Sequence, residues 1–258
     1  MAKVRLDQLL VARGLAPTRA RAQAVVLSGD VFVGGQRVDK AGALVAEEAV
    51  VEVRAEPHPY VSRGGVKLAG ALDAFALEVR GLRCLDLGAS TGGFTECLLQ
   101  RGAVQVVAVD VGYGQLAHKL RTDPRVTVLE RTNARTLHAQ DIGGPVDLTV
   151  VDASFIGLGK LLAAIARCTR QDGDLVALVK PQFEVGRSEA ARSKGVVRDE
   201  SVRAEAIAGV AHEVAEAGFA VRGQRDSVLP GPKGNLEAFV WARRGPAGEA
   251  PPGDPVVR

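Results

Sequence analysis

The first 40 residues carry two helical patterns of apolar side chains, followed by a pattern typical of a hairpin. Three leucines recur at helical spacing and Gly14 follows them, which predicts a helix over 5–13 with a glycine cap. A second helix is expected to begin after Thr18 and to end at Gly29, and valines on both sides of Gly34-Gly35 predict a hairpin. The apolar positions that carry these predictions are Leu6, Leu9, Leu10, Ala22, Val25, Val26, Val31, Val33 and Val38.

From residue 83 onward, short apolar runs alternate with helical patterns. This alternation predicts an α/β domain of the Rossmann-like class, with a mostly parallel sheet and helices on both of its faces. A long amphipathic helix is expected around 204–217, and two more strands follow it. The predicted strands cover 84–87, 104–109, 126–129, 146–151, 175–179, 220–228 and 237–241.

Breaks in these patterns divide the 258 residues into four segments. The run Glu-Pro-His-Pro-Tyr at 56–60 interrupts any regular element, so it indicates a linker. The end of the chain is rich in Gly, Pro and Ala, which is typical of a disordered tail. We therefore expect a small α+β domain over 1–55, a linker over 56–62, the larger α/β domain over 63–244 and a disordered tail over 245–258.

Composition narrows the class of protein. Apolar residues make up 47% of the chain and charged residues 24%, which is typical of a globular protein with a filled core. Cys84, Cys97 and Cys168 are odd in number and far apart, so they suggest neither a disulfide framework nor a metal site, and a reducing cytoplasm fits best. The apolar runs are too short to span a bilayer, which argues against secretion, a membrane span and a pore.

Charge is unevenly distributed along the chain. Between residues 1 and 40 there are seven Lys and Arg residues but three Asp residues. Arg19 and Arg21 fall in the first turn of the second predicted helix, where the helix dipole does not favour a cation, so an external phosphate is their expected partner. The alternative is that these arginines only solvate a small domain.

The N-terminal segment resembles the small RNA-binding domain found in a ribosomal small-subunit protein, in many pseudouridine synthases and in bacterial tyrosyl-tRNA synthetases. The segment departs from that domain at Glu47-Glu48-Ala49, where a Gly-Asp turn is usual, so the resemblance leaves the last strand open. The residues that carry the resemblance are Arg5-Leu6-Asp7, Gly14-Leu15, Thr18-Arg19, Ala22, Gly29-Asp30-Val31, Val33, Gly35 and Lys40.

A run of small residues follows the first strand of the larger domain. Small residues let backbone amides approach a ligand, and Asp110, 22 positions after Gly88, can accept hydrogen bonds from ribose hydroxyls. The glycine spacing is poor for a dinucleotide, and the Lys of a P-loop is lacking, so S-adenosylmethionine is the expected ligand. The alternative is a turn with a structural role alone. The predicted cofactor-binding residues are Asp86, Gly88, Ala89, Ser90, Thr91, Gly92, Gly93, Phe94, Asp110, Asn133 and Asp152.

Two charged residues end apolar strands of the larger domain. Asp152 follows the fourth strand and Lys180 follows the fifth, so both are expected at the carboxyl edge of the sheet, where ligands bind in this architecture. Glu237 begins the final strand, and an antiparallel final strand would bring it to the same edge. Lys67 lies in the helix that leads into the sheet and can reach the same pocket. The alternative is that these four residues form ordinary salt bridges.

The order Lys67, Asp152, Lys180 and Glu237 resembles the Lys-Asp-Lys-Glu tetrad of FtsJ-like RNA 2′-O-methyltransferases. With the N-terminal domain and the runs at 62–68, 89–95, 180–184 and 195–197, nearly the whole chain resembles the TlyA family, whose members are often labelled hemolysins. The resemblance implies that ribosomal RNA or a ribosomal subunit is the partner. It implies methylation of a cytidine in the large subunit, in some members also in the small subunit, and loss of that methylation confers capreomycin resistance.

The tetrad suits deprotonation of a weak nucleophile. A sulfonium methyl group is already activated, so the enzyme must mainly align the ribose hydroxyl and remove its proton. We predict that Lys180 accepts this proton. Lys67 would favour the neutral form of Lys180 by repulsion, and Asp152 and Glu237 would hold the Lys180 amine in place.

Candidate RNA contacts are spread over both domains. Phe155 or Phe183 is a candidate to stack on one flipped cytidine, and Arg63 and the loop 183–198, with Arg187, Arg192 and Lys194, are candidates for phosphate contacts or for a solvated surface alone. The sequence leaves open the modified subunit, the form of the RNA substrate and the oligomeric state, for which a monomer is the expectation. The other functions considered are a non-catalytic RNA-binding protein and a nicotinamide-dependent oxidoreductase. The predicted RNA-binding residues are Lys3, Arg5, Arg19, Arg21, Lys40, Arg63, Phe155 and Phe183.

Overall fold

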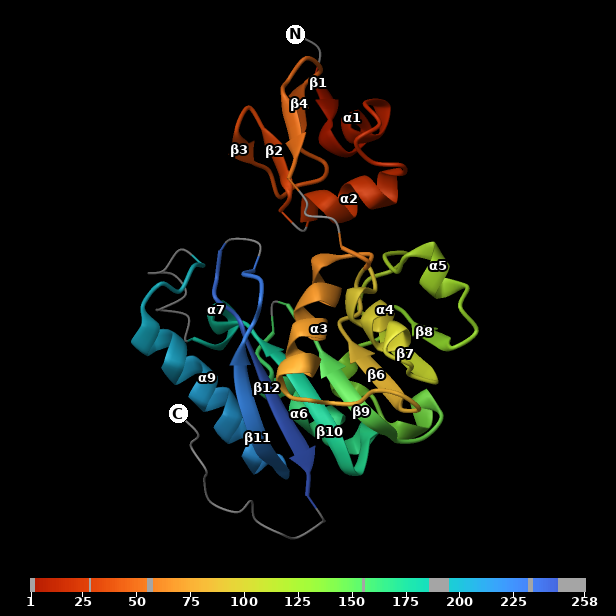
Figure 1. Cartoon of the computed structure of the whole chain (residues 1–258), viewed down its shortest axis with the longest axis vertical. Helices are drawn as coiled ribbons and strands as arrows, with labels where there is room; N and C mark the ends of the chain where they lie inside the picture. Colours follow the sequence, from red (N-terminus) through yellow and green to blue (C-terminus); the bar gives the residue numbers. More distant parts are fainter. Residues whose placement is uncertain are drawn as a thin grey trace.

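The computed structural model describes residues 3–27, 29–54, 58–154, 156–185, 195–231 and 234–245. Two folded parts are visible in Figure 1, a small N-terminal one and a larger one built around a central sheet. Residues 246–258, to which we assigned a disordered tail, lie outside the described residues, as do Arg187, Arg192 and Lys194 of the basic loop. None of the described helices is both long enough and apolar enough to cross a membrane.

The small domain packs two helices against two short sheets. Its core consists of six buried side chains from both helices, the segment between them and β2. The hairpin is confirmed, because Gly34 and Gly35 both adopt positive φ angles and β2 pairs with β3 across them. The elements are β1 (Lys3–Arg5), α1 (Leu6–Ala12), α2 (Arg19–Leu27), β2 (Val31–Val33), β3 (Gln36–Arg37), β4 (Leu44–Ala46) and β5 (Val51–Val53).

The last strand of the small domain forms despite the unusual residues before it. Glu47 and Glu48 lie in a turn that the Ala49 N–H closes by donating to the Ala46 carbonyl, 3.0 Å away. This turn lets β5 pair antiparallel with β2, so the domain keeps a three-stranded sheet in the order β3-β2-β5. A second sheet pairs β1 with β4. The first predicted helix, 5–13, is present as α1 (Leu6–Ala12), and the strand β1 that precedes it was not predicted.

The larger domain is built on a seven-stranded sheet in the order β11-β12-β10-β9-β6-β7-β8. Neighbours from β10 to β8 run parallel, whereas β12 runs antiparallel to both β10 and β11, which confirms the prediction for the final strand. Its strands are β6 (Arg83–Leu87), β7 (Gln105–Val109), β8 (Val126–Leu129), β9 (Val146–Val151), β10 (Thr169–Val179), β11 (Phe219–Asp226) and β12 (Ala238–Arg244).

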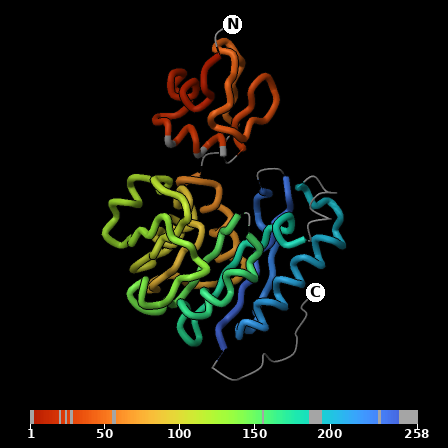
Figure 2. Tube along the Cα trace, turned by 180° about the vertical axis from the view of Figure 1, so that it is seen from behind, coloured from red at the N-terminus to blue at the C-terminus, as the bar shows by residue number. Residues whose placement is uncertain are grey.

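Helices cover both faces of this sheet, as the alternation of patterns predicted (Figures 1 and 2). Successive strand residues point to opposite faces, so in β6 Leu85 and Leu87 pack with α6 and α9, whereas Cys84 packs with α3 and α4. The sheet is thus buried on both sides. The helical elements are α3 (Arg63–Ala74), α4 (Gly93–Gln100), α5 (His118–Arg121), η1 (Ala134–Thr136), η2 (Ala139–Ile142), α6 (Gly159–Cys168), α7 (Pro181–Glu184) and α9 (Glu200–Glu216).

Candidate active site

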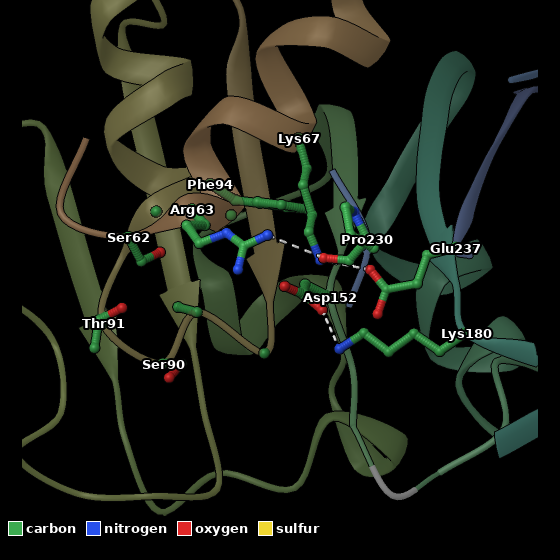
Figure 3. A pocket seen from close by; sticks show the side chains of 14 residues that line it. Ser62, Arg63, Lys67, Ser90, Thr91, Phe94, Asp152, Lys180, Pro230 and Glu237 are labelled. Atoms are coloured by element: carbon green, nitrogen blue, oxygen red, sulfur yellow. Dashed lines mark hydrogen bonds and ion pairs between the residues drawn. The ribbon is translucent and has the colours of Figure 1, made fainter. Parts of the chain in front are cut away.

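Four charged side chains meet at the carboxyl edge of the sheet. Asp152 and Lys180 directly follow the parallel strands β9 and β10. Glu237 directly precedes β12, and because that strand is antiparallel its beginning lies at the same edge. Lys67 reaches this edge from α3, and Figure 3 shows the four side chains converging on one pocket. The structure therefore brings together the four residues that we had singled out from separate parts of the sequence.

The four side chains form two ion pairs. Lys67 Nζ donates to Glu237 Oε2 at 2.5 Å, and both side chains are buried. Lys180 Nζ lies 2.5 Å from Asp152 Oδ1 and donates to Ser154 Oγ at 2.8 Å. We had expected Glu237 to hold the Lys180 amine, but Glu237 pairs with Lys67 of α3 instead. Ser154 is a neighbour that the sequence reasoning missed, although it lies only two positions after Asp152.

The glycine-rich segment after β6 forms one wall of the same pocket. Gly88 has a φ of +86°, and a Cβ there would lie 2.5 Å from the backbone oxygen of Asp152. Any other residue would therefore collide with the end of β9. Gly92 also has a positive φ, and so has Ser90, at 97° and 48° respectively. This backbone brings the segment close to the pocket without side-chain bulk, as a cradle for a small ligand requires.

Asp86 is fully buried at the end of β6. Its Oδ2 accepts a hydrogen bond from Thr95 Oγ1 at 2.6 Å, whereas its Oδ1 has no hydrogen-bond partner among the described residues. Burial raises the pKa of Asp86 to about 7, the Thr95 hydroxyl opposes that rise, and the negative charges of Asp152 and Asp110 add to it. A buried carboxylate with one unsatisfied oxygen fits a ligand that brings a donor or a positive charge.

Asp110 fixes the shape of the glycine-rich segment. Its Oδ2 accepts from the Ser90 backbone N–H at 2.8 Å, and its Oδ1 accepts from the Gly112 N–H at 2.7 Å. Asn133 has a different position, because it is exposed and caps η1 through a hydrogen bond from the Arg135 N–H. Asn133 is absent from the described lining of the pocket, and so are Asp86, Gly92 and Asp110. Asp110 holds the lining residue Ser90, whereas no contact among the described residues joins Asn133 to a lining residue, so the predicted cofactor contact of Asn133 has no support from this geometry.

The pocket is lined by 14 described residues, most of which the sequence had indicated. Phe94 lies at its base, where its ring packs 6.1 Å from that of Phe239. Ser62, Gly64 and Pro230 were missed. The first two flank Arg63 in the run at 62–68, so their position was readable, whereas nothing local marks Pro230.

The arginines predicted to bind RNA have partners within the small domain and its linker. Asp7 is completely buried and accepts hydrogen bonds from Arg5, Arg19 and Gln23 at 2.9 to 3.0 Å. These donors hold the pKa of Asp7 well below its usual range, with the Arg5 hydrogen bonds as the largest cause. Arg21 donates to the backbone carbonyl of Val61 in the linker. These arginines therefore have partners within the protein. The side chains of Arg5 and Arg19 also face solvent, since they are 40% and 53% exposed.

The remaining RNA candidates occupy different surroundings. Lys3 and Lys40 are exposed on the small domain. Arg63 lines the pocket, where it contacts Asp30 of the small domain. Phe183 lies in α7, where its N–H donates to the Lys180 carbonyl at 2.8 Å, but it lines a second hollow and is absent from the described lining of the tetrad pocket. Phe155 lies outside the described residues.

Two protein-family models match the chain. The model of the FtsJ-like methyltransferase family matches residues 60–244, and that of the S4 domain matches residues 4–51. These two matches correspond to the larger and the small folded parts, and the first contains Lys67, Asp152, Lys180 and Glu237.

Relatives match over nearly the whole chain. A 16S/23S rRNA (cytidine-2′-O)-methyltransferase TlyA from Mycobacterium tuberculosis is 51% identical over 93% of this chain and 90% of the relative. A protein named hemolysin A from Brachyspira hyodysenteriae is 36% identical over 91% of this chain and 97% of its own length. A solved structure of a hemolysin-like protein from Streptococcus thermophilus aligns with a TM-score of 0.75 and 39% identity, covering 97% of this chain and 90% of that one.

Proposed function

Because this chain belongs to the FtsJ-like methyltransferase family and carries an S4 domain, we propose that it transfers a methyl group from S-adenosylmethionine to the ribose 2′-hydroxyl of a cytidine in ribosomal RNA. The observation that carries this proposal is the pocket in which two Lys-carboxylate pairs face a glycine-rich segment. The relative from M. tuberculosis is named for both 16S and 23S RNA, so we propose a large-subunit cytidine as substrate and a small-subunit cytidine as a second one.

The pocket fits the cofactor. S-adenosylmethionine supplies a methyl group that its sulfonium centre already activates. The unsatisfied Oδ1 of Asp86 suits the positive charge of its amino-acid end, and the backbone around Gly88 leaves room for close approach. Asp110 keeps the Ser90 amide in place and has further lone pairs for ribose hydroxyls. We propose these residues as the cofactor-binding set.

Lys180 is the proposed proton acceptor. Its amine donates to Ser154 Oγ and lies against Asp152 Oδ1, so two neighbours fix its position at the end of β10. In its neutral form the amine carries one lone pair, and that lone pair can receive the proton of a ribose hydroxyl placed in the pocket. Fixing the acceptor matters because an aligned hydroxyl and base remove much of the entropic cost of the reaction.

Lys67 has a different proposed role. Its hydrogen bond to the fully buried Glu237 keeps a positive charge at the pocket wall. Positive charge held close to the pocket favours the negative charge that develops on the ribose oxygen as its proton leaves, since the interaction is strong where water is excluded. In this proposal Lys180 accepts the proton and Lys67 supplies positive charge, and each lysine is held by a different carboxylate.

The proposal is tested by mapping 2′-O-methylation on ribosomal RNA from cells with and without this protein. We expect one cytidine of the large-subunit RNA, and one of the small-subunit RNA, to lose the modification when the protein is absent. Purified protein with radiolabelled S-adenosylmethionine should restore it, on free RNA or on isolated subunits, and comparing these two identifies the form that is recognised. The same set of 2′-O-methylated cytidines in cells with and without the protein would refute the proposal.

A further inference from the structure

The described part of the β11–β12 loop, residues 227–231 and 234–237, contacts one face of α3. Near the middle of the helix, Lys67 holds Glu237 at the end of this loop. One turn further along, Gly70 leaves room for Val228 at its beginning, since a Cβ on Gly70 would lie 2.7 Å from Val228 Cγ1. Positions three and four apart share a helix face, so α3 acts as a template for the loop that carries Glu237.

The first residue of α3 extends the same face toward the small domain. Arg63 Nη2 donates to the Pro230 carbonyl in the loop at 3.3 Å, and Figure 3 shows this contact beside the tetrad. The other end of the same guanidinium, Nη1, donates to Asp30 Oδ1 of the small domain at 3.3 Å. The side chain of Asp30 is 11% exposed and that of Arg63 21%, so both partners are largely shielded from water. One side chain thus joins the small domain to the loop.

Asp30 is well placed to act as an anchor. Its backbone is held on both sides, because its carbonyl accepts from the Arg54 N–H at 2.8 Å and its N–H donates to the Val25 carbonyl at 3.3 Å. It directly precedes β2, whose first residue belongs to the small-domain core. The carboxylate of Asp30 is therefore fixed relative to the small domain as a whole.

Asp30 also offsets positive charge at the pocket. The pocket contains three cationic side chains, those of Arg63, Lys67 and Lys180. Glu237 pairs with Lys67 and Asp152 pairs with Lys180, so these two acids are already engaged. Arg63 is also the first residue of a helix, where the dipole disfavours a cation. The carboxylate that offsets its charge comes from the other domain.

We infer that Asp30 is a positioning residue that acts through Arg63, so that docking of the small domain sets the position of the described part of the β11–β12 loop and of the Lys67–Glu237 pair. This inference rests on the proposed function for its effect on rate. It means that the Arg63–Asp30 ion pair links the small domain, which is proposed to hold the RNA, to the wall of the catalytic pocket.

A double-mutant cycle tests the link. We expect Asp30→Asn and Arg63→Gln each to lower kcat for methyl transfer by about tenfold, and the double variant to lose no more than either single one, because both remove the same connection. RNA affinity should change less than twofold for Asp30→Asn. Arg63→Lys keeps the charge but cannot span both partners, so an intermediate kcat is expected. Multiplied losses in the double variant, or an unchanged kcat in Asp30→Asn, would overturn the inference.

Hydrogen exchange gives a readout that needs neither RNA nor cofactor. The Ser227 N–H donates to the Glu237 carbonyl and the Gly231 N–H to the Asn235 carbonyl, so these amides report on the loop. We expect both to exchange about tenfold faster in Asp30→Asn. Asp73→Asn is the matched control, because it breaks the ion pair of an α3 aspartate with Arg101, away from the pocket.

The two proposals fail in distinguishable ways. A wild-type protein without methyl transfer would refute the proposed function and leave the exchange result standing. Loop exchange that is equal in wild type and Asp30→Asn, in a protein whose wild type is active, would refute the inference alone. A folded small domain in each variant is checked by the exchange of its own core amides.

Discussion

Each of the two domains buries one aspartate completely, and the two carboxylates are treated in opposite ways. Asp7 in the small domain receives donors on both oxygens, from Arg5, Arg19 and Gln23, and its pKa is lowered. Asp86 in the larger domain receives one donor, Thr95, and burial raises its pKa to about 7. Both oxygens of Asp7 accept hydrogen bonds, whereas Oδ1 of Asp86 has no hydrogen-bond partner among the described residues.

The difference separates a structural acid from a ligand-binding one. A satisfied buried carboxylate stabilises the fold that surrounds it, whereas an unsatisfied one costs stability until something binds. The larger domain carries this cost at the sheet edge, beside the two lysine pairs. The small domain instead uses Asp7 to hold arginines at its surface.

The largest effect is expected for the larger domain alone. Lys180→Met should lower the rate of methyl transfer by about a thousandfold, because the proposed proton acceptor is lost. RNA affinity should stay within about twofold, since the arginines of the small domain are untouched. Initial rates with radiolabelled cofactor and filter binding of RNA measure the two quantities. Lys160→Met, at an exposed lysine of α6, is the control. Parallel losses of rate and RNA affinity would contradict the division between the domains.

Asp86→Asn should weaken cofactor binding without lowering the stability of the ligand-free protein at pH 8. The amide can still accept from Thr95 but lacks the charge, so the affinity for S-adenosylmethionine should fall by about thirtyfold by calorimetry. The raised pKa means that the folded protein holds the Asp86 proton more tightly than the unfolded chain, so stability is lost as pH rises through about 7. At pH 8 the ligand-free variant should therefore melt at or above the wild-type temperature. A clearly lower melting temperature there would show that Asp86 is a structural acid after all.

Asp7→Asn should instead lower the free energy of unfolding at neutral pH. The lowered pKa of Asp7 makes its stabilisation fully present above the unfolded pKa, and that stabilisation is lost as pH falls. With half-exposed arginine partners, we expect a loss of about 1 to 2 kcal/mol at pH 7, measured by calorimetric unfolding of the full chain. The deficit should shrink below about pH 4. Asp39→Asn, at an exposed position, should change stability by less than about 0.5 kcal/mol.

The smallest effect is a pH dependence of cofactor binding. Below pH 7 the protonated Asp86 must release its proton before a cationic ligand can pair with it. The affinity should therefore drop about fivefold to tenfold for each pH unit below 7 and level off above it. Titrations between pH 6 and pH 8 measure this slope, and Asp86→Asn should abolish it. If the affinity of Asp86→Asn depended on pH as strongly as that of the wild type, a group other than Asp86 would be responsible for the pH dependence.

The functional residues divide into those that local sequence indicated and those that it did not. Asp152 and Lys180 could be placed because each ends an apolar strand of a predicted parallel sheet. Asn133 was named among the cofactor-binding residues, but the structure puts it at an exposed position where it caps η1. Pro230 gave no local signal, because a proline in a loop looks the same wherever the loop lies.

The apolar patterns were enough to locate the strands of the larger domain and the charged residues next to their ends, because periodicity is a local property of the chain. They did not predict β1 or β4 of the small domain, and they could not show which charges pair. Glu237 holds Lys67 rather than Lys180, and Asp30 reaches Arg63 across the domain boundary. Ion pairs act over a few ångströms, and these partners lie 170 and 33 positions apart, so no pattern along the chain encodes their distances.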